Sequence, residues 1–480
     1  MPDFKDLVVI IPGILGSRLV HRDGKREVTV WDLSIKGLPR ALLALASGRL
    51  ALESHDREPD DGVFASDLFS FQLLPGLIGV DDYAPLVQML KKAAPNPLQL
   101  ITFPYDWRAS NRFAAQHLER RALEALAQWR AASGQADAKL WLVCHSMGGL
   151  VARYFCEHLD GARHTRAIVT FGTPHRGAAK ALGALSNGLK FGPIDLSATV
   201  RSLPSVYELL PLYPAVRVPS DHALLMHRVA DFFGLDAVTG ANTTSPVSLR
   251  ALPGLDREML KSALAFHANI RLPAEQRQRD GVPVPYRQQA FFNRRQPTPL
   301  SARLMGNRLE LLDTYPELRN GHIVDEAHGG DGTVPSFAAM PIEWADTGDA
   351  VALTDKHAAM QCAAAGIETL FNWLQPMPVA GKKGAVEGDL NAVSLALPPA
   401  VALGEPLPVT LAAPLPMALT LSIESADGGG RKTARLLLPG GNLPLQVELK
   451  PGAPGAWRVT AQPDDRVRPA IADWVYVFET

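Results

Sequence analysis

Residues 139–158 read KLWLVCHSMGGLVARYFCEH. Lys139 to Val143 is an apolar run, typical of a parallel strand that is buried on both faces. Gly148 to His158 places its apolar residues at helical spacing and predicts an amphipathic helix. Only a tight turn around Ser146 separates the two. The stretch therefore predicts a strand, a sharp turn and a helix, which is the repeating unit of an α/β fold.

Strands and helices alternate on both sides of this unit. The pattern predicts further strands at Leu7 to Ile11, Leu98 to Phe103, Ala167 to Phe171 and Ala350 to Leu353, and helices at Asp82 to Ala93, Ser110 to Ala132 and His357 to Leu374. Strands that alternate with helices at this spacing favour a parallel sheet covered by helices.

The regular alternation is interrupted twice and then ends. We expect a catalytic domain over residues 1–375, with cap or lid insertions at about 22–80 and 177–320. The second insertion has short helical stretches, such as Arg257 to Ala268, and no sheet pattern of its own. Residues 376–388 form a linker rich in proline, glycine and lysine. Residues 389–480 hold about seven short strands, which predicts a β-sandwich of immunoglobulin or fibronectin III type.

Composition restricts the class of protein. The chain has 480 residues, a net charge of −1 and 47% hydrophobic residues, which is ordinary for a globular protein. No basic block suggests nucleic-acid binding. The three cysteines make neither a disulfide framework nor a metal cluster, so we expect no metal and no cofactor. Neither a transmembrane run nor a signal peptide is visible, and this favours the cytoplasm, with peripheral membrane contact as an option.

The turn after the 139–143 strand has the form of a nucleophile elbow. Cys144-His145-Ser146-Met147-Gly148 matches G-x-S-x-G with cysteine in place of the first glycine. Such an elbow holds a serine hydroxyl clear of the backbone, so that a nearby base can take its proton. We therefore predict Ser146 as the nucleophile of an α/β-hydrolase fold. His145 should point away from the nucleophile and be structural.

The acid and the base follow from chain order, because this fold orders its triad as serine, acid, histidine. Asp331 lies in a glycine-rich turn, Gly329 to Pro335, that can present a short carboxylate. His357 is the last histidine and the only one after Asp331, so it becomes the predicted base. Asp325 and Glu326 are competing acids outside the glycine-rich turn.

An oxyanion hole needs two backbone N–H groups that point at the developing negative charge. Met147, directly after the nucleophile, is one predicted donor. The loop after the first strand supplies the other, and we choose Ile14, between Gly13 and Gly16.

These motifs together resemble the lecithin:cholesterol acyltransferase family, which includes lysosomal phospholipase and phospholipid:diacylglycerol acyltransferases. The resemblance spans roughly residues 7–375 and is carried by segments 8–17, 105–108, 144–149, 203–211, 330–335 and 356–357. It implies transfer of a fatty acyl group from a lipid ester through an acyl-serine to an alcohol or to water. It also places Trp31 near the family's lid and membrane-binding region.

Several alternatives stay open at this stage. Hydrolysis and acyl transfer share one acyl-enzyme, and the sequence distinguishes neither the acyl donor nor the acceptor. A non-lipid carboxylesterase, a peptidase or a non-catalytic scaffold on a hydrolase core are rival functions. The apolar stretch Leu38 to Leu45 fits either a membrane-touching lid or a packed helix. The sequence identifies no protein partner for the sandwich.

Overall fold

The computed structural model describes most of the chain. The described residues are 4–24, 26–32, 38–53, 58–68, 83–219, 225–243, 252–320, 322–344, 350–374, 392–465 and 468–479. Within them, no helix combines the length and the apolar character that a membrane span requires. The predicted linker, 376–388, lies outside the described residues.

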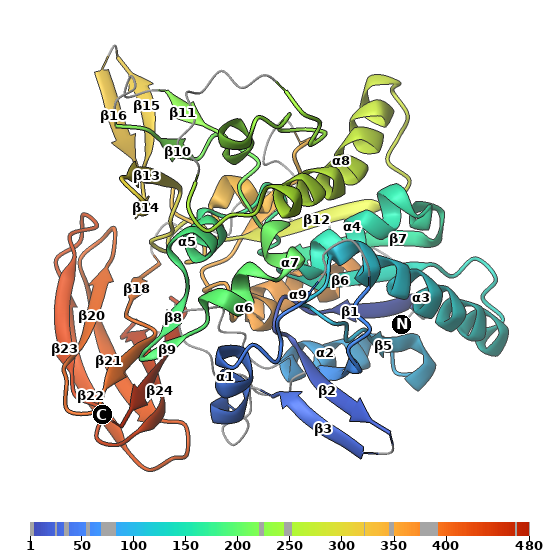
Figure 1. The fold of residues 1–480 in the computed structure, drawn as a ribbon. Coiled ribbons are helices and arrows are strands. Elements are labelled where there is room, and N and C mark those ends of the chain that lie inside the picture. Colours follow the sequence, from blue (N-terminus) through green and yellow to red (C-terminus); the bar gives the residue numbers. More distant parts are fainter. Residues whose placement is uncertain are drawn as a thin grey trace.

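A six-stranded parallel sheet forms the centre of the molecule (Figure 1). Its order is β17-β12-β7-β6-β1-β5, and every neighbouring pair is parallel. The strands are β1 (Leu7–Ile11), β5 (Leu100–Thr102), β6 (Leu140–His145), β7 (Thr165–Phe171), β12 (Arg287–Phe292) and β17 (Ala350–Ala352). The predicted α/β architecture with a central parallel sheet is confirmed.

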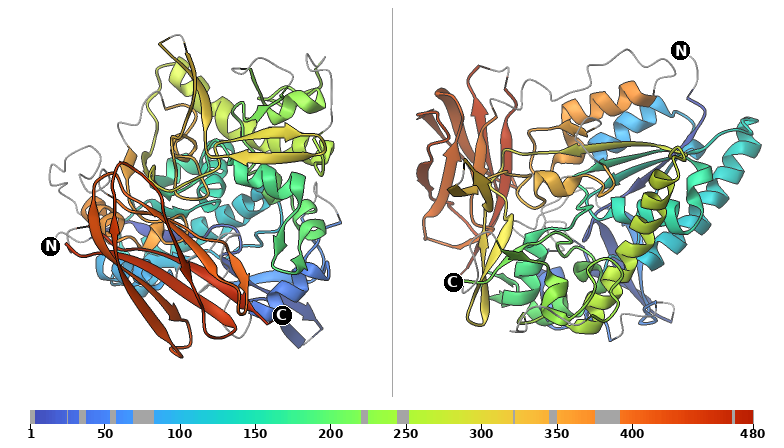
Figure 2. Two further views of the ribbon diagram at one scale, coloured as in Figure 1. Left: turned by 90° about the vertical axis from the view of Figure 1, so that its left-hand side faces the viewer. Right: turned by 90° about the horizontal axis from the view of Figure 1, so that it is seen from above.

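Helices cover both faces of this sheet (Figure 2). Alternate side chains of β1 point to opposite faces, as the two-residue period of a strand requires. Leu7, Val9 and Ile11 join the core beneath α3 (Asn111–Ser133) and α4 (Gly148–His158). Val8 and Ile10 join the core beneath α2 (Ala84–Ala93) and α9 (Ala364–Leu374). This two-sided burial explains the continuous apolar run of β1.

Two sequence predictions about the core are wrong. The predicted insertion 177–320 contains β12, which pairs with β7 in the central sheet. Its first half, Arg287 to Gln289, is polar, so it lacks the apolar run by which the other central strands were found. The final helix begins at Ala364 instead of His357. The N–H of His357 donates to Asp331 O at 2.9 Å, and this bond ties the segment to the acid loop.

The cap elements lie in three segments of the chain. The first follows β1, the second precedes β12 and the third follows β12. The first holds β2 (Ser17–Asp23), β3 (Arg26–Trp31), α1 (Leu38–Ala46) and β4 (Val63–Leu68). The second holds α5 (Ala179–Asn187), β8 (Lys190–Phe191), β9 (Ile194–Asp195), α6 (Ser197–Arg201), α7 (Pro204–Tyr207), β10 (Val216–Arg217), β11 (Met226–His227) and α8 (Arg257–Arg279). The third holds β13 (Ser301–Met305), β14 (Arg308–Leu312), β15 (Tyr315–Arg319) and β16 (His322–Glu326). The order β11-β10-β13-β14 makes a small sheet, contrary to the expectation of no sheet pattern.

The C-terminal region is rich in strands, and all seven predicted strands are present. They are β18 (Ser394–Ala396), β20 (Leu407–Ala412), β21 (Met417–Ser425), β22 (Arg431–Leu438), β23 (Leu445–Leu449), β24 (Gly455–Pro463) and β25 (Ile471–Phe478). A short eighth strand, β19 (Ala400–Ala402), was not predicted and pairs in parallel with β25. The strands form sheets of three and five around one shared hydrophobic core. The immunoglobulin or fibronectin III type stays a prediction.

Candidate active site

Ser146 lies at the turn between β6 and α4, in a backbone conformation that residues other than glycine rarely adopt. Its φ is 50°, in the left-handed region. Three hydrogen bonds hold it there: its N–H donates to Phe171 O at 2.8 Å, and its carbonyl accepts from Thr173 Oγ1 at 2.8 Å and from Gly149 N at 3.1 Å. A Cβ at Gly148 would lie 2.4 Å from Pro12 O. Glycine therefore lets α4 start directly against the end of β1.

The three predicted triad residues meet at this turn. Ser146 Oγ lies 2.8 Å from His357 Nε2, and His357 Nδ1 lies 2.7 Å from Asp331 Oδ2. All three residues are buried, with exposed fractions of 3%, 3% and 1% for Ser146, His357 and Asp331. A carboxylate only accepts hydrogen bonds, so Nδ1 carries the proton and Nε2 is free to accept from the serine hydroxyl.

Backbone groups orient the carboxylate of Asp331. Its Oδ1 accepts from Val334 N at 2.7 Å and from Thr333 N at 2.9 Å, which leaves Oδ2 for the histidine. Gly332 has a φ of 93°, and a Cβ at Gly330 would lie 2.2 Å from Val334 O. The glycine-rich turn is thus needed to fold the loop around its own carboxylate, as the sequence predicts.

The competing acids lie elsewhere. Both are on β16: Asp325 pairs with Arg217 at 2.5 Å, and Glu326 pairs with Arg319 at 3.0 Å. Neither residue lines the cavity beside Ser146. The structure therefore brings Asp331 and not its rivals to the serine.

His145 directs both ring nitrogens to neighbouring loops and not to Ser146. Its Nε2 lies 2.9 Å from the carbonyl of His357, and its Nδ1 lies 3.0 Å from Tyr83 Oη. Because a carbonyl only accepts, Nε2 is the protonated nitrogen and Nδ1 accepts from the phenol. Tyr83 Oη in turn accepts from Gly13 N at 3.1 Å. Burial lowers the pKa of His145 to about 3, so the ring is neutral.

The two predicted oxyanion donors have N–H groups without a partner among the described residues. The N–H of Ile14 and that of Met147 donate to none of those residues. The turn that carries Ile14 is closed by a bond from Gly16 N to Gly13 O at 3.1 Å, with Leu15 at a φ of 65°. A Cβ on Gly13 would lie 2.9 Å from Ser146 Cβ, so glycine permits this close approach.

Sequence reasoning missed two residues at the site. A Cβ on Gly172 would lie 2.8 Å from Asp331 Oδ2 and 2.9 Å from His357 Nδ1. The only signal for this glycine is its position directly after β7. Tyr83 was missed because its partners, Gly13 and His145, belong to distant segments of the chain.

Trp31, which the family resemblance places near a lid, lies behind two residues of the cavity wall, Leu15 and Trp107. Its side chain is fully buried and does not line the cavity beside Ser146. Its ring packs edge-on against Trp107 at 5.0 Å, and its Nε1 donates to Leu15 O at 3.1 Å. Trp31 therefore supports the loop that carries Ile14 from behind, and its burial excludes it from a membrane contact in this conformation.

The apolar stretch after Trp31 forms α1, which packs against the core on one side. Leu42 and Leu45 are buried, whereas the side chain of Leu43 is 66% exposed. Leu45 also lines the cavity beside Ser146. The helix is thus packed, as one of the two sequence interpretations expects, and it lies beside the cavity; membrane contact stays a prediction.

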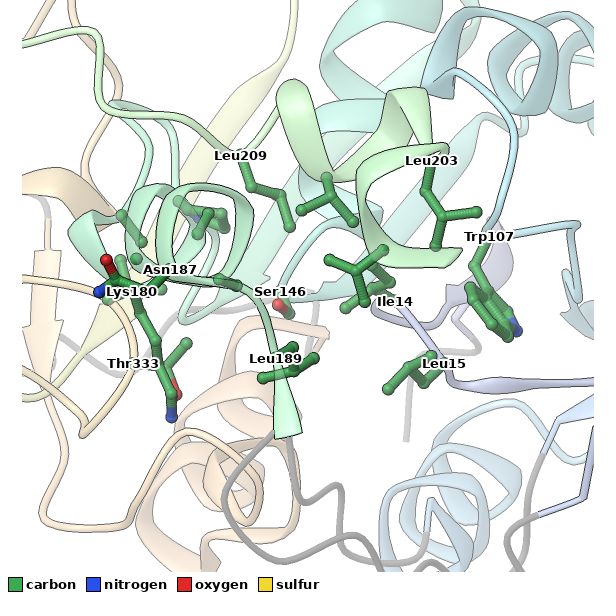
Figure 3. A pocket seen from close by; sticks show the side chains of 18 of the residues that line it. Ile14, Leu15, Trp107, Ser146, Lys180, Asn187, Leu189, Leu203, Leu209 and Thr333 are labelled. Carbon is green, nitrogen blue, oxygen red and sulfur yellow. The ribbon is translucent and has the colours of Figure 1, made fainter. Parts of the chain in front are cut away.

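A largely apolar cavity of about 310 Å³ opens onto Ser146 (Figure 3). Figure 3 shows the serine between Ile14 on one side and Lys180 and Thr333 on the other. Further lining residues include Leu15, Leu189, Val200, Leu203, Val206, Leu209 and Leu311. Among the lining residues described, Lys180 is the only charged one, and burial lowers the pKa of its ammonium group.

Within the described ranges, no group of three or more histidine, cysteine, aspartate or glutamate side chains could hold a metal ion. His328 pairs with Glu317, and His322 lies on β16 away from the triad. The site itself combines a serine, a histidine and a carboxylate beside an apolar cavity.

Residues 58–249 match the family model for lecithin:cholesterol acyltransferase (LCAT). Over this stretch the chain is LCAT-like in sequence. The match includes Ser146 and α7, and it ends before Asp331 and His357. No curated protein matches the chain.

Solved structures resemble different parts of the LCAT-like chain. The crystal structure of the Tle4–Tli4 complex includes a chain that is 14% identical, with 78% of this chain and 99% of that chain covered and a TM-score of 0.44. The CARDB domain of a Pyrococcus furiosus protein is 14% identical over 19% of this chain and 94% of its own, with a TM-score of 0.16. A PKD domain of a peptidase from a Thermoplasmatales archaeon is 14% identical over 18% of this chain and 91% of its own, with a TM-score of 0.14.

Proposed function

We propose that the chain is a serine-dependent hydrolase or O-acyltransferase of lipid esters that works through an acyl-serine intermediate. The observation that carries the proposal is the Ser146–His357–Asp331 hydrogen-bonded chain, at 2.8 and 2.7 Å, at the edge of an apolar cavity. A hydrogen-bonded serine, base and acid is the arrangement that activates a hydroxyl for attack on an acyl carbon.

The proposed reaction has two halves. His357 Nε2 takes the proton of Ser146 Oγ as that oxygen attacks the ester carbonyl, and Asp331 stabilises the imidazolium that forms. The N–H groups of Ile14 and Met147 receive the oxyanion. His357 then returns the proton to the departing alcohol. Water, or a second alcohol, repeats the sequence in reverse and frees the serine.

The cavity supports an acyl chain as the group that it binds. Its lining is dominated by leucine, valine, alanine and isoleucine side chains, which cannot hydrogen-bond a polar substrate. Each methylene buried there contributes about 0.8 kcal/mol, or up to about fourfold in kcat/KM. Long-chain esters should therefore be preferred to acetyl esters until the cavity is full.

The first experiment compares the wild type with Ser146→Ala on p-nitrophenyl esters of increasing chain length and on phospholipid vesicles. We expect kcat of the variant to fall at least about 10³-fold. Ser186→Ala is a matched control, because Ser186 is also buried and its hydroxyl has no partner among the described residues. Its activity should equal that of the wild type.

Two results would contradict parts of this proposal. Failure of a fluorophosphonate probe to label the wild type at Ser146 would favour a non-catalytic scaffold. A kcat/KM that is highest for acetyl esters would favour a non-lipid esterase. Product analysis with and without an added alcohol separates the two chemistries, because only a transferase forms a new ester.

A further inference from the structure

The C-terminal strand domain contacts the loop that carries the base. Lys356, the residue before His357, forms an ion pair with Asp473 of β25. The two side chains are only 13% and 26% exposed. An ion pair that is largely shielded from water is screened little by salt, so its partners hold each other more firmly than exposed ones do.

The same domain contacts the loop that carries the acid. The side chain of Gln296 donates to Val393 O at 3.3 Å and accepts from Leu395 N at 3.2 Å, at the start of β18. The main chain of Gln296 exchanges two hydrogen bonds with Gly330, at 2.9 and 3.1 Å. Gly330 directly precedes Asp331. Gln296 is fully buried, so water does not compete for these hydrogen bonds.

A third contact reaches the cavity wall. Phe191 of β8 is buried against Phe478 of β25, with ring centroids 5.7 Å apart. The β8–β9 hairpin is anchored at its base by a bond from Leu196 N to Leu189 O at 2.8 Å, and Leu189 lines the cavity. One strand of the C-terminal domain, β25, thus contacts both the base loop and the hairpin beside the cavity.

Charged side chains from the catalytic region and from the C-terminal domain interact beside these contacts. Burial lowers the pKa of Lys180, whereas the neighbouring carboxylates Asp473 and Asp331 raise it, and Lys356 lowers it. Two ammonium groups and two carboxylates therefore interact beside the cavity. One of the two carboxylates, Asp473, comes from the C-terminal domain.

We propose that the C-terminal domain positions the acid and base loops of the site: Asp473 holds Lys356 beside His357, and β18 holds Gln296, which fixes the loop of Asp331. This inference rests on the proposed function of the triad. Asp473 and Gln296 are positioning residues and touch no substrate. A small displacement of a catalytic group costs a large factor in rate, so the effect should appear in kcat more than in KM.

The test is a set of Asp473 variants in the full-length chain. Asp473→Asn removes the charge with little change in shape and leaves Lys356 without its partner. We expect kcat for p-nitrophenyl butyrate to fall about tenfold, with KM within about twofold. The rate of fluorophosphonate labelling of Ser146 should fall by a similar factor.

A charge exchange and a matched control distinguish positioning from general stability. Lys356→Asp combined with Asp473→Lys restores the pair in reverse and should recover most of the lost kcat. Asp464→Asn is the control, since it breaks the Arg435–Asp464 pair within the same domain, away from the two loops. It should leave kcat unchanged.

Each outcome decides the inference. A folded Asp473→Asn variant with wild-type kcat overturns it, and so does an equal loss in Asp473→Asn and Asp464→Asn. If Asp473→Asn does not fold, the exchanged pair decides: recovered kcat supports positioning, and a folded but slow protein overturns it. If the wild type itself neither turns over esters nor labels, the proposed function fails first. Labelled wild type with an unaffected Asp473→Asn variant means that the positioning role alone fails.

Discussion

Gly172 follows β7 at the point where a side chain would displace two members of the triad. A Cβ there would approach both Asp331 Oδ2 and His357 Nδ1 closer than 3 Å. Real Cβ atoms do not tolerate such contacts, so the histidine or the acid would have to move. The arrangement thus depends on the absence of an atom at this position as much as on the three side chains that meet there.

Gly172→Ala should lower kcat by about 10²-fold, because the histidine and the acid cannot both keep their positions. The variant also forces alanine into the left-handed region, at a cost of about 1–2 kcal/mol. Gly306→Ala separates the two effects, since Gly306 has a similar φ, 62° against 59°, and no atom within 4 Å of the added Cβ. Equal kcat for the two variants, measured on the same ester, would contradict the steric argument.

Residue-level prediction from sequence is strongest where chemistry and chain order restrict the choice. Ser146, Asp331 and His357, which meet at one turn in the structure, were selected because few residues of the right type occur in the required order. Tyr83 and Gly172 were not found, because their roles depend on which loops lie side by side in space. Trp31 was placed by resemblance alone; the structure buries it against Trp107, and its lid role stays a prediction.

At the level of the elements, a series of hydrogen bonds connects the ends of β1 and β6 with the segment after β17. His145 links the His357 carbonyl to Tyr83, and Tyr83 links onward to Gly13 beside Ile14. The base loop and the proposed oxyanion loop therefore share one buried hydrogen-bonded connection.

Tyr83→Phe removes the central atom of that connection and leaves the Gly13 N–H without its acceptor in a buried site. We expect kcat to fall about tenfold, because the Gly13 turn loses its anchor, while KM changes little. Tyr213→Phe removes the hydroxyl of a tyrosine in the cap, which donates to Leu300 O at 3.0 Å, and serves as the control. A Tyr83→Phe enzyme as fast as Tyr213→Phe would show that the connection is dispensable.

Element prediction worked best where periodicity and burial agree. Helix α4 begins and ends at the predicted residues, because an apolar strand precedes it and its buried face has regular spacing. Strand β12 was not predicted because its first residues, Arg287 and Gln288, are polar. In the structure it lies between β7 and β17. The predicted helix at His357 failed because a tertiary hydrogen bond to Asp331 holds that segment.

For the whole molecule, buried titratable groups predict how stability depends on pH. Burial lowers the pKa of His145 to about 3, that of His267 to about 4 and that of His175 well below its usual value. Burial raises the pKa of Glu208 to about 7. The folded state thus keeps three histidines neutral that the unfolded chain protonates near pH 6.5. It also keeps one carboxyl protonated that the unfolded chain ionises above about 4.5.

Acidification from pH 7 to pH 5 should therefore lower the free energy of unfolding. Each histidine lowers the free energy of unfolding by at most about 1.4 kcal/mol per pH unit below pH 6.5. Between about pH 4.5 and pH 7, Glu208 acts in the opposite direction and offsets the contribution of one histidine. Urea denaturation at several pH values measures the slope. In Glu208→Gln the opposing contribution is absent, so the fall should be steeper. A shallower fall in that variant would contradict the assignment.

The docking of the C-terminal domain lay beyond the reach of the sequence. Its strands were predicted from alternation, but nothing in that alternation shows that Asp473 lies beside Lys356, 117 positions earlier. Such contacts follow from how two separately formed cores pack, which local patterns do not encode.

The separation of the site residues along the chain also affects the order in which the site assembles during synthesis. The serine leaves the ribosome 211 residues before its histidine partner. Until His357 emerges, the nascent chain holds the proposed nucleophile without its proposed base, and strand β25 emerges later still. Because domains form as units in the order of translation, the proposed triad can assemble only after the segment that follows β17 has been made. On the proposed mechanism, the order of synthesis thus keeps the earlier nascent chain from attacking esters without a separate inhibitor.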